Sequence, residues 1–306
     1  VFMEESVIID LSISSMGRGP MNRLHASWAV AVVLVTACAG TARATPILYA
    51  AADDVLYTLN TTTGAVDSVI GPIRFEVTGL AFHPTTGVLY GTTSNLSPSN
   101  PRSLITIDPN TGVGTLIGST SGHVMTDIAF DSSGTLYGWS GWRDRGTSDL
   151  NTINLTTGAA TIVGDFGGDT SGNGLAFDSS GTLYADLRFP VPGSTHTINP
   201  ATGLATGTIA KIGVSSSSFF NAMAYDPDTG LLFGMSRQNP GFTLFTMDPN
   251  TGVVTQLGVE QFSIRFDALA FVTTAIPEPS SLALLAFGAI GLVGSRRIRR
   301  RTRSEC

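Results

Sequence analysis

Short runs of apolar and β-branched residues alternate with turn-forming residues along most of this 306-residue chain. The most regular stretch, at 80–91, reads LAFHPTTGVLYG, and it returns at 128–138, 175–185 and 223–234. Its front half occurs alone at 269–271 and its back half alone at 48–50. The split of one unit between two distant ends predicts a chain that closes on itself.

The repeat has a measurable period. Its central alanine is followed through the chain at steps of 48, 47, 48 and 46 residues, as Ala81, Ala129, Ala176, Ala224 and Ala270. A turn glycine recurs at similar steps of 48, 46, 45 and 49 residues, as Gly64, Gly112, Gly158, Gly203 and Gly252. A fixed period in this range indicates a propeller or a solenoid.

Each period contains four short runs, which we name a to d; in the first full period they lie at 78–82, 88–92, 104–108 and 114–118. Their length, β-branched content and bounding turns predict strands. The a–b link at 83–87 and the c–d link at 108–112 each contain proline and end in glycine, which suits tight hairpins. The aspartates that open such links, as at 226–230, are expected to hydrogen-bond their own turn rather than to bind calcium, because an EF-hand loop is longer and ends in glutamate.

Five such units fit the chain. Runs at 47–50, 55–60 and 65–70 supply strands b, c and d of one blade, and 266–271 supplies its missing strand a. With four complete blades between them, residues 45–275 are predicted to form an all-β, five-bladed β-propeller. The repeats resemble those of propeller families with an LAFDP…G.LYG…DP.TG pattern, a resemblance that implies the fold and leaves the function open.

The small and aromatic residues of the repeat are interpreted as structural. The central alanines and the small residue after each strand-b aromatic let neighbouring blades approach near the axis. The aromatics beside them are expected to fill the space between blades; they include Phe82, Tyr90, Phe130, Tyr137, Phe177 and Tyr184.

Two segments precede the repeats. Residues 1–20 show no secretory pattern, and we expect them to be an extension upstream of a start at Met21. Residues 21–44 have the parts of a signal peptide, namely Arg23, an apolar run at 28–39 and the small residues Ala42 and Ala44. Signal peptidase is expected to cleave after Ala44, giving a secreted form that begins near Thr45; an uncleaved anchor and a lipoprotein acylated at Cys38 are the alternatives.

The segment at 276–306 contains Pro277, Glu278 and Pro279, an apolar run at 280–295, and arginines that begin with Arg296 and Arg297. An apolar run that ends in arginines is typical of a transmembrane helix whose basic side stays cytoplasmic. Together with Pro-Glu-Pro, it resembles the PEP-CTERM sorting signal, which exosortase-type membrane peptidases process in Gram-negative bacteria. The resemblance implies export, a transient inner-membrane intermediate and a final place at the cell surface or in the extracellular matrix. An ordinary C-terminal anchor would lack the Pro-Glu-Pro.

Charge and cysteine content fit an exported domain. Residues 45–275 contain 8 Lys and Arg against 18 Asp and Glu, a net charge of −10, whereas the whole chain has −6. Cys38 and Cys306 both lie in segments expected to be removed, so the mature domain would have no disulfide or thiol chemistry. An acidic domain is a poor candidate for binding nucleic acid. The sequence shows neither a glycine-rich phosphate loop nor a histidine-rich metal signature, and it predicts no metal or cofactor.

The first candidate site lies on the b–c and d–a loops, which vary in length and share one face of the predicted propeller. Variable loops on a rigid frame are where binding usually occurs. One b–c loop contains two tryptophans and three charged residues: Trp139, Trp142, Arg143, Asp144 and Arg145. The indoles are predicted to stack on sugar rings while the charged groups bind hydroxyls, and the opposite, turn face is expected to be inert. The alternative is that one or both indoles fold down between blades.

The second candidate site lies on the axis. Three residues before each repeat alanine stand Thr78, Thr126, Asn173, Asn221 and Asp267, with Asp127 directly after Thr126. If strand a is innermost, they form a polar ring near one mouth of the channel, able to hold water, a cation or a ligand hydroxyl. Alternatively, these side chains satisfy backbone groups where the strands converge.

Three functions follow from these patterns. The first is a non-enzymatic, exported binding or matrix protein associated with exopolysaccharide. The second is a propeller hydrolase or lyase, lactonase-like or active on polysaccharide, that uses Asp127, Asp267 and His123 at the channel. The third is a structural surface protein without a small ligand.

Overall fold

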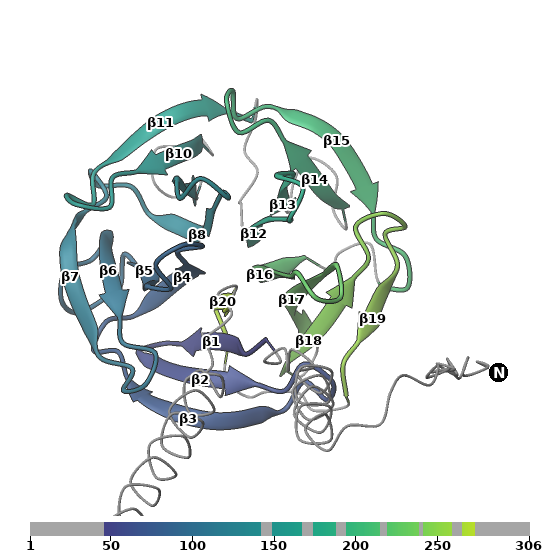
Figure 1. Ribbon diagram of the computed structural model, residues 1–306, viewed down its shortest axis with the longest axis horizontal. Coiled ribbons are helices and arrows are strands. Elements are labelled where there is room, and N and C mark those ends of the chain that lie inside the picture. Colours follow the sequence, from purple (N-terminus) through teal and green to yellow (C-terminus); the bar gives the residue numbers. More distant parts are fainter. Residues whose placement is uncertain are drawn as a thin grey trace, which may run out of the picture. The chain divides into compact units, whose positions relative to one another are not determined.

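The computed structural model describes residues 46–141, 149–166, 174–187, 194–214, 219–238, 241–258 and 265–272. In these residues, twenty strands form five four-stranded antiparallel sheets that surround one axis (Figure 1). Strand a of every sheet lies next to the axis and strand d forms the outer edge. The predicted five-bladed, all-β propeller is therefore confirmed.

The blades are numbered in chain order. Blade 1 consists of β20 (Ala268–Phe271), β1 (Leu48–Ala52), β2 (Val55–Leu59) and β3 (Val66–Pro72). Blade 2 consists of β4 (Val77–Phe82), β5 (Leu89–Thr93), β6 (Ser103–Ile107) and β7 (Gly114–Ser119). Blade 3 consists of β8 (Met125–Phe130), β9 (Leu136–Ser140), β10 (Asp149–Ile153) and β11 (Ala160–Asp165). Blade 4 consists of β12 (Gly174–Phe177), β13 (Leu183–Leu187), β14 (Ser194–Ile198) and β15 (Ala205–Ala210). Blade 5 consists of β16 (Phe220–Asp226), β17 (Leu231–Gln238), β18 (Gly241–Met247) and β19 (Val254–Gln256).

Blade 1 closes the ring with strands from both ends of the repeat region. β20 pairs antiparallel with β1, in a register that places Phe271 opposite Leu48 and Ala268 opposite Ala51. This is the predicted closure, and it joins the two ends of the repeat region within one blade by backbone hydrogen bonds. An open edge strand at either end is thereby avoided.

The hairpin turns follow their local sequence. The five c–d turn glycines have φ between +74° and +81°, where a side chain would be strained. In the turn after β6, the Asp108 carboxylate accepts the Asn110 N–H at 2.9 Å. His83 replaces the aspartate of other a–b turns, and its Nδ1 accepts the N–H groups of Thr85 and Thr86 at 3.2 and 3.3 Å. The turn aspartates therefore serve turn geometry, as predicted.

The Leu-Ala-Phe repeat packs neighbouring blades together. Five clusters of buried residues lie between blades, and each sets the small alanine of one strand a against the larger side chains of the next strand a. Between blades 2 and 3, for example, Ala81 contacts the cluster of Ile128 and Phe130. Burying each large side chain contributes about 1.5–3 kcal/mol.

Aromatic side chains of strand b reinforce the same interfaces. In four blades, this aromatic packs against an aromatic of the next blade's strand a with ring centroids 5.0 to 5.4 Å apart, in the pairs Tyr49–Phe82, Tyr90–Phe130, Tyr137–Phe177 and Phe233–Phe271. The prediction that these aromatics fill the space between blades is confirmed.

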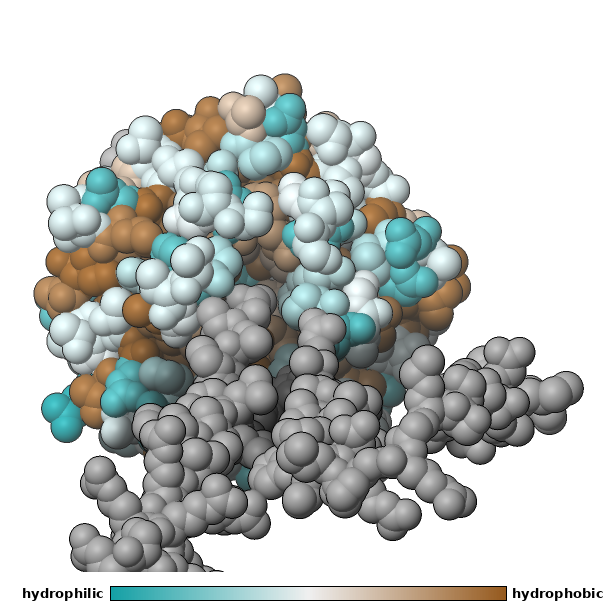
Figure 2. Space-filling model, in the orientation of Figure 1, coloured by the Kyte–Doolittle hydropathy of each residue, from teal (hydrophilic) through white to brown (hydrophobic). Residues whose placement is uncertain are grey.

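The outer edge of the ring holds close backbone contacts as well as exposed apolar side chains. A Cβ built at Gly158 would lie 2.3 Å from the Gly118 carbonyl oxygen of the preceding blade, so this c–d turn needs glycine for space as well as for φ. Strands β3, β7 and β11 each expose one large apolar side chain to solvent, namely Val69, Leu116 and Ile162. Apolar residues accordingly reach the edge of the ring in Figure 2.

Candidate functional site: an axial pocket

A pocket of about 310 Å³ lies on the axis of the ring, on the face that carries the a–b turns. We call this face the turn face, the opposite one the loop face, and the cavity the axial pocket. All five innermost strands line it, and each contributes an aliphatic residue, an alanine and an aromatic residue: Leu80 to Phe82, Ile128 to Phe130, Leu175 to Phe177, Met223 to Tyr225, and Leu269 to Phe271. The pattern that holds the blades together therefore also makes an apolar wall, which suits an apolar ligand group.

Asp127 directly precedes the lining residue Ile128 in β8, so it lies on the loop-face side of the residues that line the pocket. The equivalent position in the other four strands a has only glycine or alanine, as Gly79, Gly174, Ala222 and Ala268. The Asp127 carboxyl is therefore the one large side chain at this position of the five strands a. Asp127 is fully buried.

Three backbone N–H groups hold the Asp127 carboxyl. Its Oδ2 accepts Leu175 N–H at 2.9 Å and Met223 N–H at 3.1 Å, and its Oδ1 accepts Ile128 N–H at 2.9 Å. These donors come from blades 4, 5 and 3, so one side chain joins three blades. Burial raises the pKa of Asp127 well above the usual range, and the three N–H donors oppose that shift without overcoming it.

The mouth of the pocket is acidic. The a–b turns of blades 3 and 4 place Asp131, Ser132, Asp178 and Ser179 at the lining, together with Pro84 and Pro227 of neighbouring blades. The Asp178 carboxylate accepts Tyr184 O–H at 3.1 Å. Burial, and then the charge of Asp178, raise the pKa of Tyr184 to about 12, so its hydroxyl stays a donor at neutral pH.

The polar ring predicted on the axis is only partly described, because Asn173 lies outside the described residues. Thr78 donates its hydroxyl to the Met125 carbonyl at 2.7 Å, and Thr126 donates to the Trp139 carbonyl at 3.1 Å. These two threonines thus satisfy backbone groups, which was the alternative interpretation of the ring. Asn221 is also buried.

Asp267 has a different environment from the threonines of the predicted ring. It forms an ion pair with Arg265, whose side chain is 59% exposed. Burial raises the pKa of Asp267 to about 6, Arg265 opposes this shift, and Asp53 and Glu76 add to it. Asp267 is therefore a carboxyl that titrates between acidic and neutral pH.

The predicted sugar-binding tryptophan Trp139 is buried, and this prediction needs correction. Strand β9 continues through Trp139 to Ser140, so the residue belongs to a strand rather than to a loop. Its side chain is 1% exposed and packs against Phe166 with ring centroids 6.1 Å apart. Trp139 therefore plugs the interface between blades 3 and 4, which was the alternative. Trp142, Arg143, Asp144 and Arg145 lie outside the described residues.

The hydrogen bonds of Asp127, the ion pair of Asp267 and the backbone bonds of His123 do not join these three residues into the predicted catalytic group. Asp127 directs both carboxyl oxygens to backbone N–H groups, whereas Asp267 pairs with Arg265. His123 is buried in the link before β8, where its backbone N–H and carbonyl both bond Thr120. These contacts give the two carboxyls separate structural partners instead of the shared environment expected of an acid–base pair.

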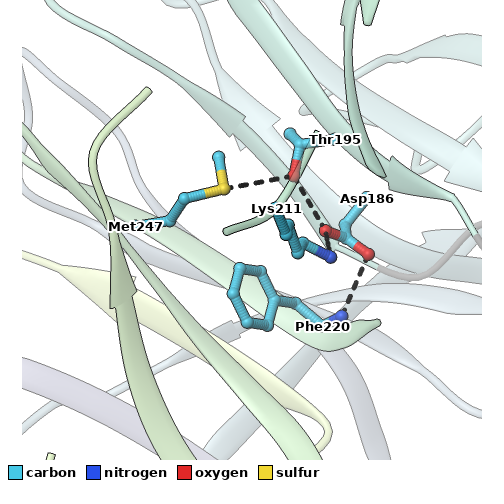
Figure 3. A network of polar contacts seen from close by, with 5 residues as sticks. All are labelled: Asp186, Thr195, Lys211, Phe220 and Met247. Carbon is cyan, nitrogen blue, oxygen red and sulfur yellow. Dashed lines mark hydrogen bonds and ion pairs between the residues drawn. The ribbon is translucent and has the colours of Figure 1, made fainter. Parts of the chain in front are cut away.

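Sequence inspection missed a buried ion pair between blades 4 and 5 (Figure 3). Asp186 of β13 pairs with Lys211, and both side chains are fully buried. The carboxylate also accepts Thr195 O–H at 2.9 Å and Phe220 N–H at 3.0 Å, while the ammonium lies 4.3 Å from the centre of the Phe220 ring. Aligning the strands b reveals one signal, because the other blades have Ala51, Thr92, Trp139 and Met235 where blade 4 has an aspartate.

Residues 275–300 match the model of the PEP-CTERM protein-sorting motif. The chain carries a PEP-CTERM sorting motif. This motif implies an exported, surface-sorted protein, a membrane-associated sorting intermediate and processing by an exosortase. In the part of the chain that the structure describes, no helix is long and apolar enough to cross a bilayer; the predicted transmembrane run at 280–295 lies outside that part.

Among solved structures, the nidogen/laminin complex contains a similar chain, with a TM-score of 0.50, 16% identity, and 74% of this chain and 98% of that one covered. TolB from Acinetobacter baumannii gives a TM-score of 0.49 at 13% identity, with 83% and 74% covered. A protein of unknown function from Bacteroides caccae gives 0.43 at 13% identity, with 76% and 100% covered. At such identities the nidogen/laminin likeness shows the fold alone. No curated protein sequence matches the PEP-CTERM chain.

Proposed function

We propose that the propeller of this PEP-CTERM protein is a non-enzymatic binding domain that takes an apolar ligand group into its axial pocket. The observation that carries the proposal is the pocket itself, which five blades line with fifteen aliphatic, alanine and aromatic residues. A ligand group that leaves water for such walls gains about 0.8 kcal/mol per buried CH₂. This proposal moves the expected binding face from the variable loops to the turn face.

The environment of the axial carboxyls supports binding rather than catalysis. Asp127 is buried below the pocket and holds three backbone donors, so moving it would break contacts between blades. At the mouth, Asp131 accepts the N–H groups of Ser133 and Thr135 within its own turn. Carboxyls with such structural duties are poorly suited to hydrolase or lyase chemistry, which needs a group free to exchange protons with the substrate.

A neutral, environment-sensitive apolar dye such as Nile red tests the proposal on the exported propeller. Ser132→Trp places a bulky side chain at the mouth, at an exposed turn position that lines the pocket. Thr156→Trp is the matched control, because it adds the same bulk to an exposed c–d turn position outside the pocket lining. The dye should bind wild type and control equally and the Ser132→Trp variant at least tenfold more weakly. Equal binding to all three proteins would reject the pocket as the site.

Exopolysaccharide association is a second candidate, which the b–c loop of blade 3 supports through the sequence Trp142, Arg143, Asp144 and Arg145. An indole that stacks on a sugar face contributes on the order of 1–3 kcal/mol to binding. Trp142→Ala should therefore weaken binding of the host's own exopolysaccharide and leave the melting temperature nearly unchanged. A lower melting temperature with unchanged glycan binding would assign Trp142 to packing, as for Trp139.

A further inference from the structure

The axial pocket shares one face of the propeller with the last described residues before the sorting motif. Phe271, the last residue of β20, lines the pocket. Val272 N–H then donates to the Ile47 carbonyl at 3.3 Å, three residues before the matched motif begins at residue 275. The described chain therefore ends beside the mouth of the pocket, three residues before its sorting motif.

The connection from the ring to the predicted membrane run is short. Eight residues lead from Val272 to residue 280, where the apolar run begins. An extended chain spans at most about 3.5 Å per residue, so this connection reaches about 28 Å. In the membrane-associated sorting intermediate, this short connection keeps the turn face near the bilayer. The loop face lies at the opposite ends of the strands a and is therefore farther from the membrane.

We propose that the axial pocket takes up one acyl chain of a membrane lipid while sorting holds the turn face beside the bilayer. The inference rests on the proposed function, that the pocket binds an apolar group, and it names the source and chemistry of that group. The lining supports it, because the alanines and aromatic residues of the five strands a, such as Ala81 and Phe82 in blade 2, are the lining residues that keep apolar surface exposed at the cavity.

Retention follows from the change of environment on release. An acyl chain that moves from the bilayer into the pocket goes from one apolar surrounding to another, so exchange is nearly balanced. After exosortase processing frees the domain, return of the chain to water becomes less favourable with each CH₂ that the pocket had buried. The exported propeller should therefore keep the lipid that it acquired at the membrane.

The mouth favours particular headgroups. Asp131 and Asp178 line it, and the lining residues include no lysine, arginine or histidine. Their carboxylates repel the net negative charge of a free fatty acid, whereas in a zwitterionic ethanolamine lipid the attraction of the ammonium offsets the repulsion of the phosphate. A lipid with an ethanolamine headgroup fits this mouth better than a free fatty acid does.

Native mass spectrometry on the exported protein tests the inference. Wild type, Ser132→Trp and the control Thr156→Trp are isolated after export, and each is also incubated with vesicles of phosphatidylethanolamine or with palmitate. Ser179→Trp, at an exposed position in the neighbouring turn of the mouth, is the second blocking variant if Ser132→Trp fails to fold. Melting curves identify folded variants.

Wild type and control should retain phospholipid in a one-to-one complex, with at least fivefold less on the blocking variants and less palmitate than phosphatidylethanolamine. Absence of lipid from wild type in both arms, or equal lipid on blocked and control proteins, would overturn the inference. If the blocking variants lose Nile red binding but wild type retains no lipid, only the lipid inference is refuted and the proposed function stands. Loss of both kinds of binding would remove the proposed function too.

Discussion

Replacing Asp127 tests whether one carboxyl holds three blades around the axis. Asp127→Ala removes the acceptor of the cross-blade donors Leu175 N–H and Met223 N–H, and also that of Ile128 N–H in the same strand. A buried backbone donor left without an acceptor costs about 1–3 kcal/mol. The two cross-blade donors alone therefore predict a loss of about 2–6 kcal/mol in the free energy of unfolding.

Asp127→Asn is the matched variant. Its amide oxygen can take the place of Oδ2, which accepts both cross-blade donors, while its amide nitrogen would face Ile128 N–H. Only the bond within the strand is then lost, at about 1–3 kcal/mol. Asp127→Asn should thus be clearly more stable than Asp127→Ala, although both have lost the ionisable carboxyl.

The same pair reports on pH. Because burial raises the pKa of Asp127, the folded protein holds this proton more tightly than the unfolded chain does. The resulting stability is present in acid and is lost as pH rises through the raised pKa. Wild type should therefore gain stability relative to Asp127→Asn as the pH is lowered from neutral toward 4.

Urea denaturation of the exported propeller measures these differences, with tryptophan fluorescence as the reporter, to which the buried Trp139 contributes. Equal stability of the Ala and Asn variants would show that the cross-blade bonds do not hold the axis. Parallel pH profiles of wild type and Asp127→Asn would refute the assignment of a buried, titrating carboxyl.

Three further predictions concern stability. Burial raises the pKa of Asp267 to about 6, so wild type should lose about 3 kcal/mol relative to Asp267→Asn as pH rises from below 4 to 7; urea titrations that run parallel would contradict this. Lys211→Met removes the ion-pair partner of the buried Asp186 and should lower the free energy of unfolding in urea by about 3–5 kcal/mol. Adding Asp186→Leu to the same chain should restore most of this stability, and a Lys211→Met variant as stable as wild type would show that the pair is unimportant. Gly158→Ala would put a side chain at a φ of +78° and against the Gly118 carbonyl, so it should lower the free energy of unfolding by about 1–3 kcal/mol. Thr156→Ala in the same turn should melt like wild type, and equal melting temperatures of the two variants would refute the glycine contact.

The sequence by itself determined the number of blades, the closure and most of the packing between blades. The repeated Leu-Ala-Phe and Leu-Tyr-Gly segments carry strand propensity, turn chemistry and the small and large residues that interlock. All of these act between residues within one period or at the same position in adjacent periods. Because the unit is split between 48–50 and 269–271, the sequence also required the two ends to share a blade. The export route, too, came from a local motif.

The tertiary structure alone decided what the singular residues do. Asp127 looked like a candidate for the channel mouth, but ring closure brings Leu175 N–H and Met223 N–H, 48 and 96 residues away, onto its carboxylate. The sequence pattern placed Trp139 in a loop, but β9 extends to Ser140, and as a strand residue Trp139 points into the core. The pocket on the turn face is lined by Leu-Ala-Phe residues, which the repeat pattern indicates only as packing residues. Such contacts depend on how five blades converge at one axis, and no single period contains that geometry.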